Sequence, residues 1–100
     1  MKEYSANEIL EILRNHKSLL TKYKVKRIGL FGSQSRNQTN NESDIDFLVD
    51  FEEKTFDNFI ELAFDLEDLF GRKVDLLTEN GISPYILPLI KNDIRWYETR

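Results

Sequence analysis

The sequence predicts a small α/β (α+β) domain in which a mixed β-sheet is flanked by helices. Three short segments, residues 25–31, 44–51 and 73–78, have the continuous or alternating apolar composition of strands. Stretches with apolar residues at helical spacing precede the first strand and separate the second from the third. At 100 residues and 40% hydrophobic content, we expect one domain spanning residues 1–100.

The first expected element is a helix over residues 6–20, where apolar residues recur at helical spacing. Ser5 and Glu8 stand in the positions of a capping box at its start. His16 lies inside this helix, where a lone histidine is more typical of a surface or core-edge position than of a ligand. A buried strand should follow over residues 25–31.

The segment Asp44–Phe51 alternates between apolar and polar residues and is therefore expected to be a strand with two unlike faces. Asp44 and Asp46 share one face and stand about 6–7 Å apart, because a strand rises about 3.3 Å per residue. The following acids, Asp50 and the pair Glu52-Glu53, are expected to be solvated where the strand ends. The other face holds the apolar residues Ile45, Phe47, Val49 and Phe51.

A long amphipathic helix is expected over residues 56–70, with Gly71 ending it and its aromatic side chains in the core. A third strand over residues 73–78 should then turn out at Asn80-Gly81. Ser83-Pro84 is expected to open a short helix. Residues 93–98 would form a final edge strand.

Charge is distributed unevenly along the chain. Residues 1–36 carry eight Lys or Arg and three acids, whereas the remainder carries six basic and fifteen acidic residues, for a net charge of −4. A basic stretch beside an acidic one fits an anionic substrate that meets a metal ion, although solvated surfaces produce such runs as well. With no cysteine, no membrane-length apolar run and no signal-peptide pattern, we expect a cytoplasmic protein without disulfides or thiolate metal sites.

Two groups of residues are candidates for chemistry. Gly32 and Ser33 stand where a strand exits, so backbone N–H groups and a hydroxyl there could bind phosphate, with Arg36 reaching the same anion. The spacing differs from that of a Walker A loop.

The second group is acidic. Asp44 and Asp46 on one strand face repel each other unless a cation lies between them. Asp75 stands in an otherwise apolar strand, where a carboxylate requires a partner. If the two strands are neighbours, the three carboxylates would hold Mg²⁺ or Mn²⁺ in a two-ion site, because these metals prefer oxygen ligands and leave positions for phosphate. The ligand spacing does not fit an EF-hand.

The segments "GLFGSQSRNQTNNESDIDFLVDF" and "KVDLLTE", with "ISPYILPLIKNDIRWY" after them, resemble the polymerase-β-like nucleotidyltransferases and their MNT-type minimal members. The resemblance implies a nucleotidyltransferase fold. It implies that Gly32 and Ser33 bind nucleotide phosphates, that Asp44 and Asp46 bridge two Mg²⁺ ions and that Asp75 holds the ion that activates the acceptor. MNT-type proteins resemble antitoxins paired with HEPN-domain ribonucleases, which implies transfer of AMP from ATP to a partner tyrosine.

Two other functions remain open at this point. One is a non-catalytic antitoxin that neutralises its partner by binding, and the other is nucleotidyl transfer to a small molecule or RNA. The acidic net charge and the lack of a separate basic domain argue against nucleic acid as the direct substrate.

Overall fold

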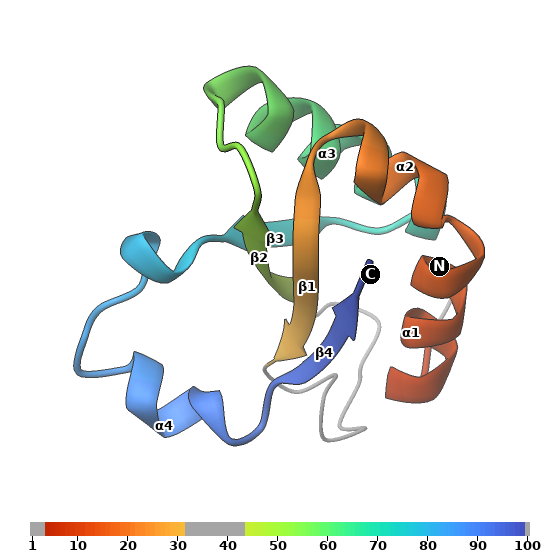
Figure 1. Ribbon diagram of the computed structural model, residues 1–100. Coiled ribbons are helices and arrows are strands. Elements are labelled where there is room, and N and C mark those ends of the chain that lie inside the picture. The colour runs from red at the N-terminus through yellow and green to blue at the C-terminus, as the bar shows by residue number, and fades with distance from the viewer. Residues whose placement is uncertain (1–3, 32–43, 100) are drawn as a thin grey trace.

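Residues 4–31 and 44–99 are described by the computed structural model, and their four strands form one sheet in the order β3-β2-β1-β4 (Figure 1). Strand β2 pairs antiparallel with β1 and parallel with β3, and β4 pairs antiparallel with the other edge of β1. The predicted mixed sheet is confirmed. The elements in chain order are α1 (Ala6–Asn15), α2 (Lys17–Lys22), β1 (Val25–Phe31), β2 (Ile45–Phe51), α3 (Phe56–Phe70), β3 (Val74–Leu77), η2 (Glu79–Gly81), α4 (Leu87–Lys91) and β4 (Arg95–Glu98).

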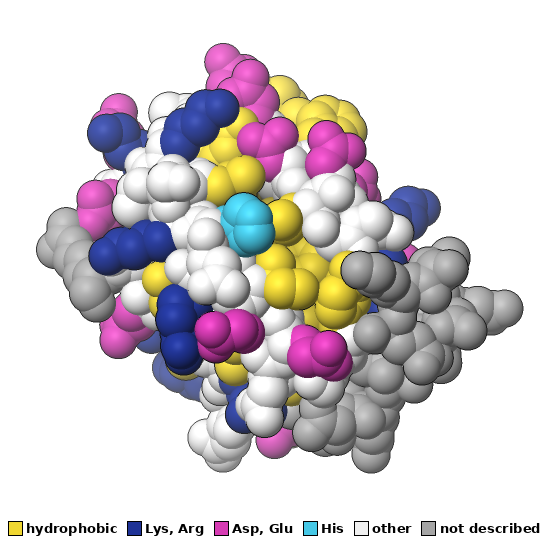
Figure 2. Space-filling model, turned by 90° about the vertical axis from the view of Figure 1, so that its right-hand side faces the viewer, with side chains coloured by type: hydrophobic (Ala, Val, Ile, Leu, Met, Phe, Trp, Pro, Cys, Tyr) yellow, Lys and Arg dark blue, Asp and Glu magenta, His cyan; other side chains and the backbone are white. Residues whose placement is uncertain are grey.

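Helices α1, α2 and α3 lie together on one side of the sheet (Figure 1). They bury the apolar face of β2 that the alternation predicts, and burial of this kind is the main stabilising contribution to so small a domain. Figure 2 looks onto this helical side, where apolar side chains show between charged ones. The core consists of Ala6, Ile9, Leu13, Leu20, Tyr23, Val25, Ile28, Leu30, Ile45, Phe47, Val49, Leu62, Leu66, Phe70, Val74 and Leu76.

The second face of the sheet is covered in part by the C-terminal segment. Leu48 points to this face yet is fully buried, which the alternation of β2 did not predict. Its Cα partner on β1 is Gly29, and a Cβ at Gly29 would overlap Ile94 and lie 2.9 Å from Trp96 Cε3. The missing side chain at Gly29 therefore lets the start of β4 approach the sheet.

The first helix is shorter than predicted. Ser5 and Glu8 form the expected capping box, but the helix over residues 6–20 breaks at His16, which has φ −122° and ψ 35°. The His16 ring Nδ1 lies 2.8 Å from the carbonyl of Ile12, and the His16 backbone N–H bonds Leu13 instead. Since the side chain replaces the helical donor to Ile12, the helix ends and a second one begins.

Helix α3 has the predicted bounds, and Gly71 ends it in the left-handed conformation with φ 64°. The prediction that its aromatic stripe lies in the core is wrong in part. Phe70 is buried, but the side chains of Phe56 and Phe64 are 77% and 62% exposed. The buried positions Leu62, Leu66 and Phe70 follow one line of the helix, and Phe56 and Phe64 lie on another.

The C-terminal elements follow the predicted order with one shifted boundary. The helix expected to open at Ser83-Pro84 begins at Leu87, because residues 84–86 form a turn in which the Ser83 hydroxyl accepts a hydrogen bond from the Tyr85 N–H. Strand β4 is an edge strand, as predicted. In the part of the chain that the structure describes, no helix is both long and apolar enough to cross a membrane.

Gly29→Ala should lower the free energy of unfolding by about 1–3 kcal/mol, the usual cost of overpacking, because the new methyl group overlaps Ile94 and Trp96. Urea denaturation measures the change. Gly81→Ala is the control, since a Cβ there would meet only Thr78 Oγ1 at 3.6 Å. Equal stability of the two variants would contradict the close approach.

Candidate active site

The pairing of β2 with β3 places two of the candidate carboxylates side by side. Asp46 and Asp75 are Cα partners in the parallel ladder, whose strands lie about 4.8 Å apart. Asp44 directly precedes β2, and its charge acts on Asp46. The register therefore sets Asp46 beside Asp75, with Asp44 next along the chain, at the end of β2 where the strand begins.

Asp75 is exposed, although its strand is otherwise apolar. Val74 and Leu76 alternate into the core beneath the helices, so Asp75 points to the opposite face of the sheet. Water reaches this carboxylate, and the expectation that it requires a partner in order to be tolerated there is wrong. An exposed carboxylate on an open sheet face is available to a ligand.

The surroundings of Asp46 shift the pKa of its carboxyl group. Its pKa is raised from the ordinary 3.8 to about 6, first by burial and then by the charges of Asp75 and Asp44 and a hydrogen bond with Asp75. Ionised Asp46 is thus disfavoured by its surroundings. A bound cation between these oxygens would reverse that effect.

Oxygen ligands alone suit Mg²⁺ or Mn²⁺ better than softer metals. Within residues 4–31 and 44–99, no three Asp, Glu or His side chains are already gathered as a metal cluster. Besides burial, which is the larger cause, repulsion by Asp75 and Asp44 raises the Asp46 pKa, and such repulsion is consistent with carboxylates that converge only when a cation is bound. The donor set therefore fits a divalent ion whose remaining positions are filled by substrate phosphate and water.

The predicted phosphate-binding residues Gly32, Ser33 and Arg36 lie outside the described residues. The last described residue before them is Phe31, whose Cα partner on β2 is Asp46. Strand β1 therefore ends directly beside the carboxylates.

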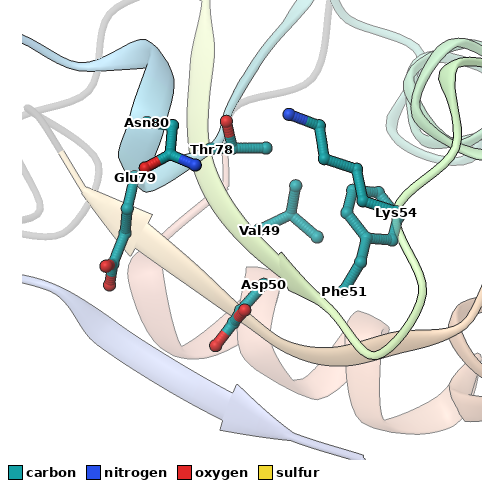
Figure 3. A pocket seen from close by; sticks show the side chains of 7 residues that line it. All are labelled: Val49, Asp50, Phe51, Lys54, Thr78, Glu79 and Asn80. Carbon is teal, nitrogen blue, oxygen red and sulfur yellow. The ribbon is translucent and has the colours of Figure 1, made fainter.

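The opposite end of β2 holds a second polar cluster, around a pocket of about 180 Å³ (Figure 3). The carboxylates of Asp50 and Glu79 lie on one side of this pocket, away from the Lys54 amine. Arg27 lies 3.3 Å from Asp50 and 3.7 Å from Glu79, with its guanidinium 3.9 Å from the centre of the Trp96 ring. The expectation that Asp50 is merely solvated is wrong, because it is ion-paired to Arg27.

Arg72 is a buried charged residue that the sequence did not single out. Its side chain is 5% exposed, which is unusual for arginine, and it precedes β3 at the same end of the sheet as Asp75. The sequence offered one signal for its burial: Arg72 stands between Gly71, which ends α3, and the apolar strand β3.

The chain belongs to the nucleotidyltransferase domain family, whose profile matches residues 9–97. A "Putative protein adenylyltransferase" of Methanocaldococcus jannaschii is 47% identical over 93 residues, which cover 88% of this chain and 93% of the relative. Both findings agree with the carboxylates on the open face, and the protein is a nucleotidyltransferase.

Solved structures share the fold. A "putative minimal nucleotidyltransferase" superimposes with a TM-score of 0.72 at 33% identity, covering 86% of this chain and 93% of its own. A chain from a mutant of the toxin–antitoxin MntA-HpeT superimposes with a TM-score of 0.62 at 26% identity, covering 95% of this chain and 72% of its own. The fold predicted from the sequence is confirmed.

Asp46→Asn should change how the stability of the metal-free protein depends on pH. Because the folded-state pKa of Asp46 is raised to about 6, its protonation stabilises the fold fully below pH 3.8, and this contribution is lost as pH rises through 6. The wild type should therefore lose stability relative to Asp46→Asn between pH 4 and 7. Melting temperatures in chelator measure the difference.

Asp50→Asn is the matched control for Asp46→Asn on the same strand. It removes a partner of Arg27 and should lower stability at pH 7, by at most about 1 kcal/mol for a pair this exposed. At pH 7 we expect Asp46→Asn to raise the melting temperature and Asp50→Asn to lower it. Shifts in the same direction would contradict the difference in electrostatics between the two ends of β2.

Proposed function

We propose that this protein transfers AMP from ATP, in a reaction that depends on Mg²⁺, to a tyrosine hydroxyl of a HEPN-domain ribonuclease and thereby acts as its antitoxin. The observation that carries the proposal is the register of β2 and β3, which sets Asp46 beside Asp75 on the open face of the sheet. Carboxylates paired in this way, without a basic residue between them in the ladder, suit metal-assisted phosphoryl chemistry.

The reaction is a displacement at phosphorus. The acceptor hydroxyl gives its proton to solvent water, and its oxygen forms a bond to the α-phosphorus of ATP. The bond to pyrophosphate then breaks, with the electron pair leaving on pyrophosphate. Bound Mg²⁺ would stabilise the negative charge of the phosphates and favour loss of the hydroxyl proton. We assign Asp44, Asp46 and Asp75 as its ligands, with Asp75, the exposed member, facing the incoming acceptor.

The phosphate-binding role belongs in this proposal to Gly32, Ser33 and Arg36. They follow β1 directly, and β1 ends at Phe31 beside Asp46. Backbone N–H groups and a guanidinium are suitable donors to a triphosphate.

The relatives support a protein as acceptor. The M. jannaschii relative is named for adenylyl transfer to protein, and one structure of similar fold comes from a toxin–antitoxin assembly. The sheet face with Asp75 is open to solvent, so a large acceptor could approach it.

Purified protein should bind ATP measurably with Mg²⁺ present, and a chelator should weaken that binding by at least tenfold. The reason is that Asp46 and its two acidic neighbours repel triphosphate unless a cation lies between them. Isothermal titration calorimetry with and without chelator measures this. Equal affinities in both conditions would contradict a metal-bridged nucleotide site.

Asp75→Asn should reduce adenylyl transfer by orders of magnitude without destabilising the metal-free fold. The side chain is exposed and one of three neighbouring acids, so its neutralisation relieves repulsion, and the asparagine amide can keep the hydrogen bond with Asp46. Labelled ATP measures transfer, and a melting curve in chelator measures stability.

The control for Asp75→Asn is Glu11→Gln on α1, an exposed acid on the helical side, which should leave transfer unchanged. An Asp75→Asn variant that melts earlier but keeps its transfer rate would show that Asp75 is a structural residue.

A further inference from the structure

The described surface has an apolar groove between the start of α3 and the end of β3. Its volume is about 380 Å³, and its floor is formed by the apolar side chains of Phe59, Leu76 and Leu77. Phe56 lines the groove and is 77% exposed, although a phenylalanine in a small domain is usually buried. Strand β3 is an edge strand, so this groove opens at the side of the sheet. An exposed apolar surface of this kind is characteristic of a binding site.

Helix α3 continues the groove with an apolar ridge flanked by acids. Phe56, Ile60 and Phe64 stand at positions i, i+4 and i+8 and form the apolar ridge. Asp57 and Glu61 lie on the next row of the helix, and Asp68 follows Phe64 by one turn; these three exposed acids are called the acidic ridge. Acidic and apolar side chains both gather along the top of the molecule in Figure 2, where α3 runs in Figure 1.

The acidic ridge costs the isolated domain stability. Helix α3 contains five acids and no base, and the ion pairs within residues 4–31 and 44–99, which are those of Arg14 and Arg27, do not involve it. Asp57 and Glu61 repel each other at i, i+4, and Asp68 lies in the last turn, where the helix dipole disfavours negative charge. A basic partner would turn each of these costs into an attraction.

We propose that this groove and the acidic ridge dock the protein acceptor, through a segment of that partner whose apolar side chains are flanked by Lys or Arg. The inference rests on the proposed function for the partner's role as acceptor. Apolar contacts with Phe56 and Phe64 would supply most of the affinity, and the acidic ridge would set orientation and association rate. A second copy of this chain fits less well, because its own α3 would bring a like-charged ridge to the contact.

The groove is also close to the chemistry. Leu77, which lines it, stands two residues after Asp75 on β3, a rise of about 7 Å. A segment seated in the groove would therefore hold the rest of the partner beside the open face, where its hydroxyl can approach Asp75. Docking and transfer would share β3 without sharing side chains.

The experiment measures binding separately from transfer. A HEPN-domain ribonuclease is fluorescently labelled and titrated, in chelator and without ATP, with wild-type protein, Phe56→Ala/Phe64→Ala and Glu61→Lys/Asp68→Lys. Each double variant should bind at least tenfold more weakly. The charge variant should also lose most of the salt dependence of the association, whereas the apolar variant should retain it.

Matched controls change the same residue types elsewhere on the surface. Leu89→Ala removes an exposed apolar side chain on α4, and Glu11→Lys reverses an exposed acid on α1. Both should bind as the wild type does. Since the altered side chains are exposed, circular dichroism melts should show that the apolar variant and the controls fold as the wild type does. Glu61→Lys/Asp68→Lys should melt no earlier than the wild type, because it removes like-charge repulsion and places positive charge at the end of α3.

The docking inference would be overturned if both double variants bound the labelled protein as tightly as the wild type does. It would also be overturned if the wild type did not bind the labelled protein. If the wild type sedimented as a dimer and the two double variants as monomers, the groove would bind a second copy of this chain. That result would overturn the docking inference as well. Weakened binding of the variants together with a wild type that transfers no AMP would support the groove and overturn the proposed function.

Discussion

The parallel ladder between β2 and β3 is the constraint on which the candidate site depends. Ile45 and Phe47 on β2 and Val74 and Leu76 on β3 all point beneath the helices, and their burial fixes how the two strands are aligned. A shift of one residue would turn these side chains out of the core, so the register is strongly specified. The adjacency of the aspartates on the other face is a consequence of that alignment. The core therefore positions the site without contacting it.

The start of β3 is held by two additional hydrogen bonds. The Ile45 N–H donates to the carbonyl of Lys73, and the Glu67 carboxylate accepts the Val74 N–H at 3.1 Å. Glu67 comes from the last turn of α3, so the helix end, the strand start and the acidic site are linked over a few residues. The bond to Glu67 also uses a donor at the edge of the sheet, which reduces the template available for unwanted strand pairing.

Much of the fold could be predicted from the sequence because its signals are local. The capping box at Ser5, the alternation along β2 and the left-handed Gly71 each depend on residues within one turn or one strand. Asp44 and Asp46 were recognised because closely spaced acids are a poor structural choice on any strand face, and Asp75 because it interrupts an otherwise apolar strand. Their meeting on neighbouring strands came from the resemblance, since spacing alone does not give strand order.

The predictions that failed depended on distant contacts. Nothing near Asp50 in the chain indicates its ion pair with Arg27, which lies 23 residues earlier on the neighbouring strand. The burial of Leu48 depends on what covers the second face, and its neighbour Gly29 admits a segment more than 60 residues further along. The exposure of Phe56 and Phe64 reflects which side of α3 meets the sheet, and periodicity alone does not fix that choice when both sides carry apolar residues.

The charged residues at the two ends of β2 have different roles: those at one end stabilise the fold, and those at the other form the candidate active site. At one end Asp50 shares an arginine with Glu79, and that arginine stacks on Trp96, so charge is matched by charge. At the other end Asp46 is half-buried beside two further carboxylates, and both its burial and their charges raise its pKa. A domain of 100 residues has little stability to lose, so an arrangement that lowers it in the free protein is best explained by what it binds. The same reasoning applies to the acidic ridge of α3: in both places the free protein bears a repulsion that a ligand of positive charge would relieve, a metal ion at the strand ends and a basic partner along the helix.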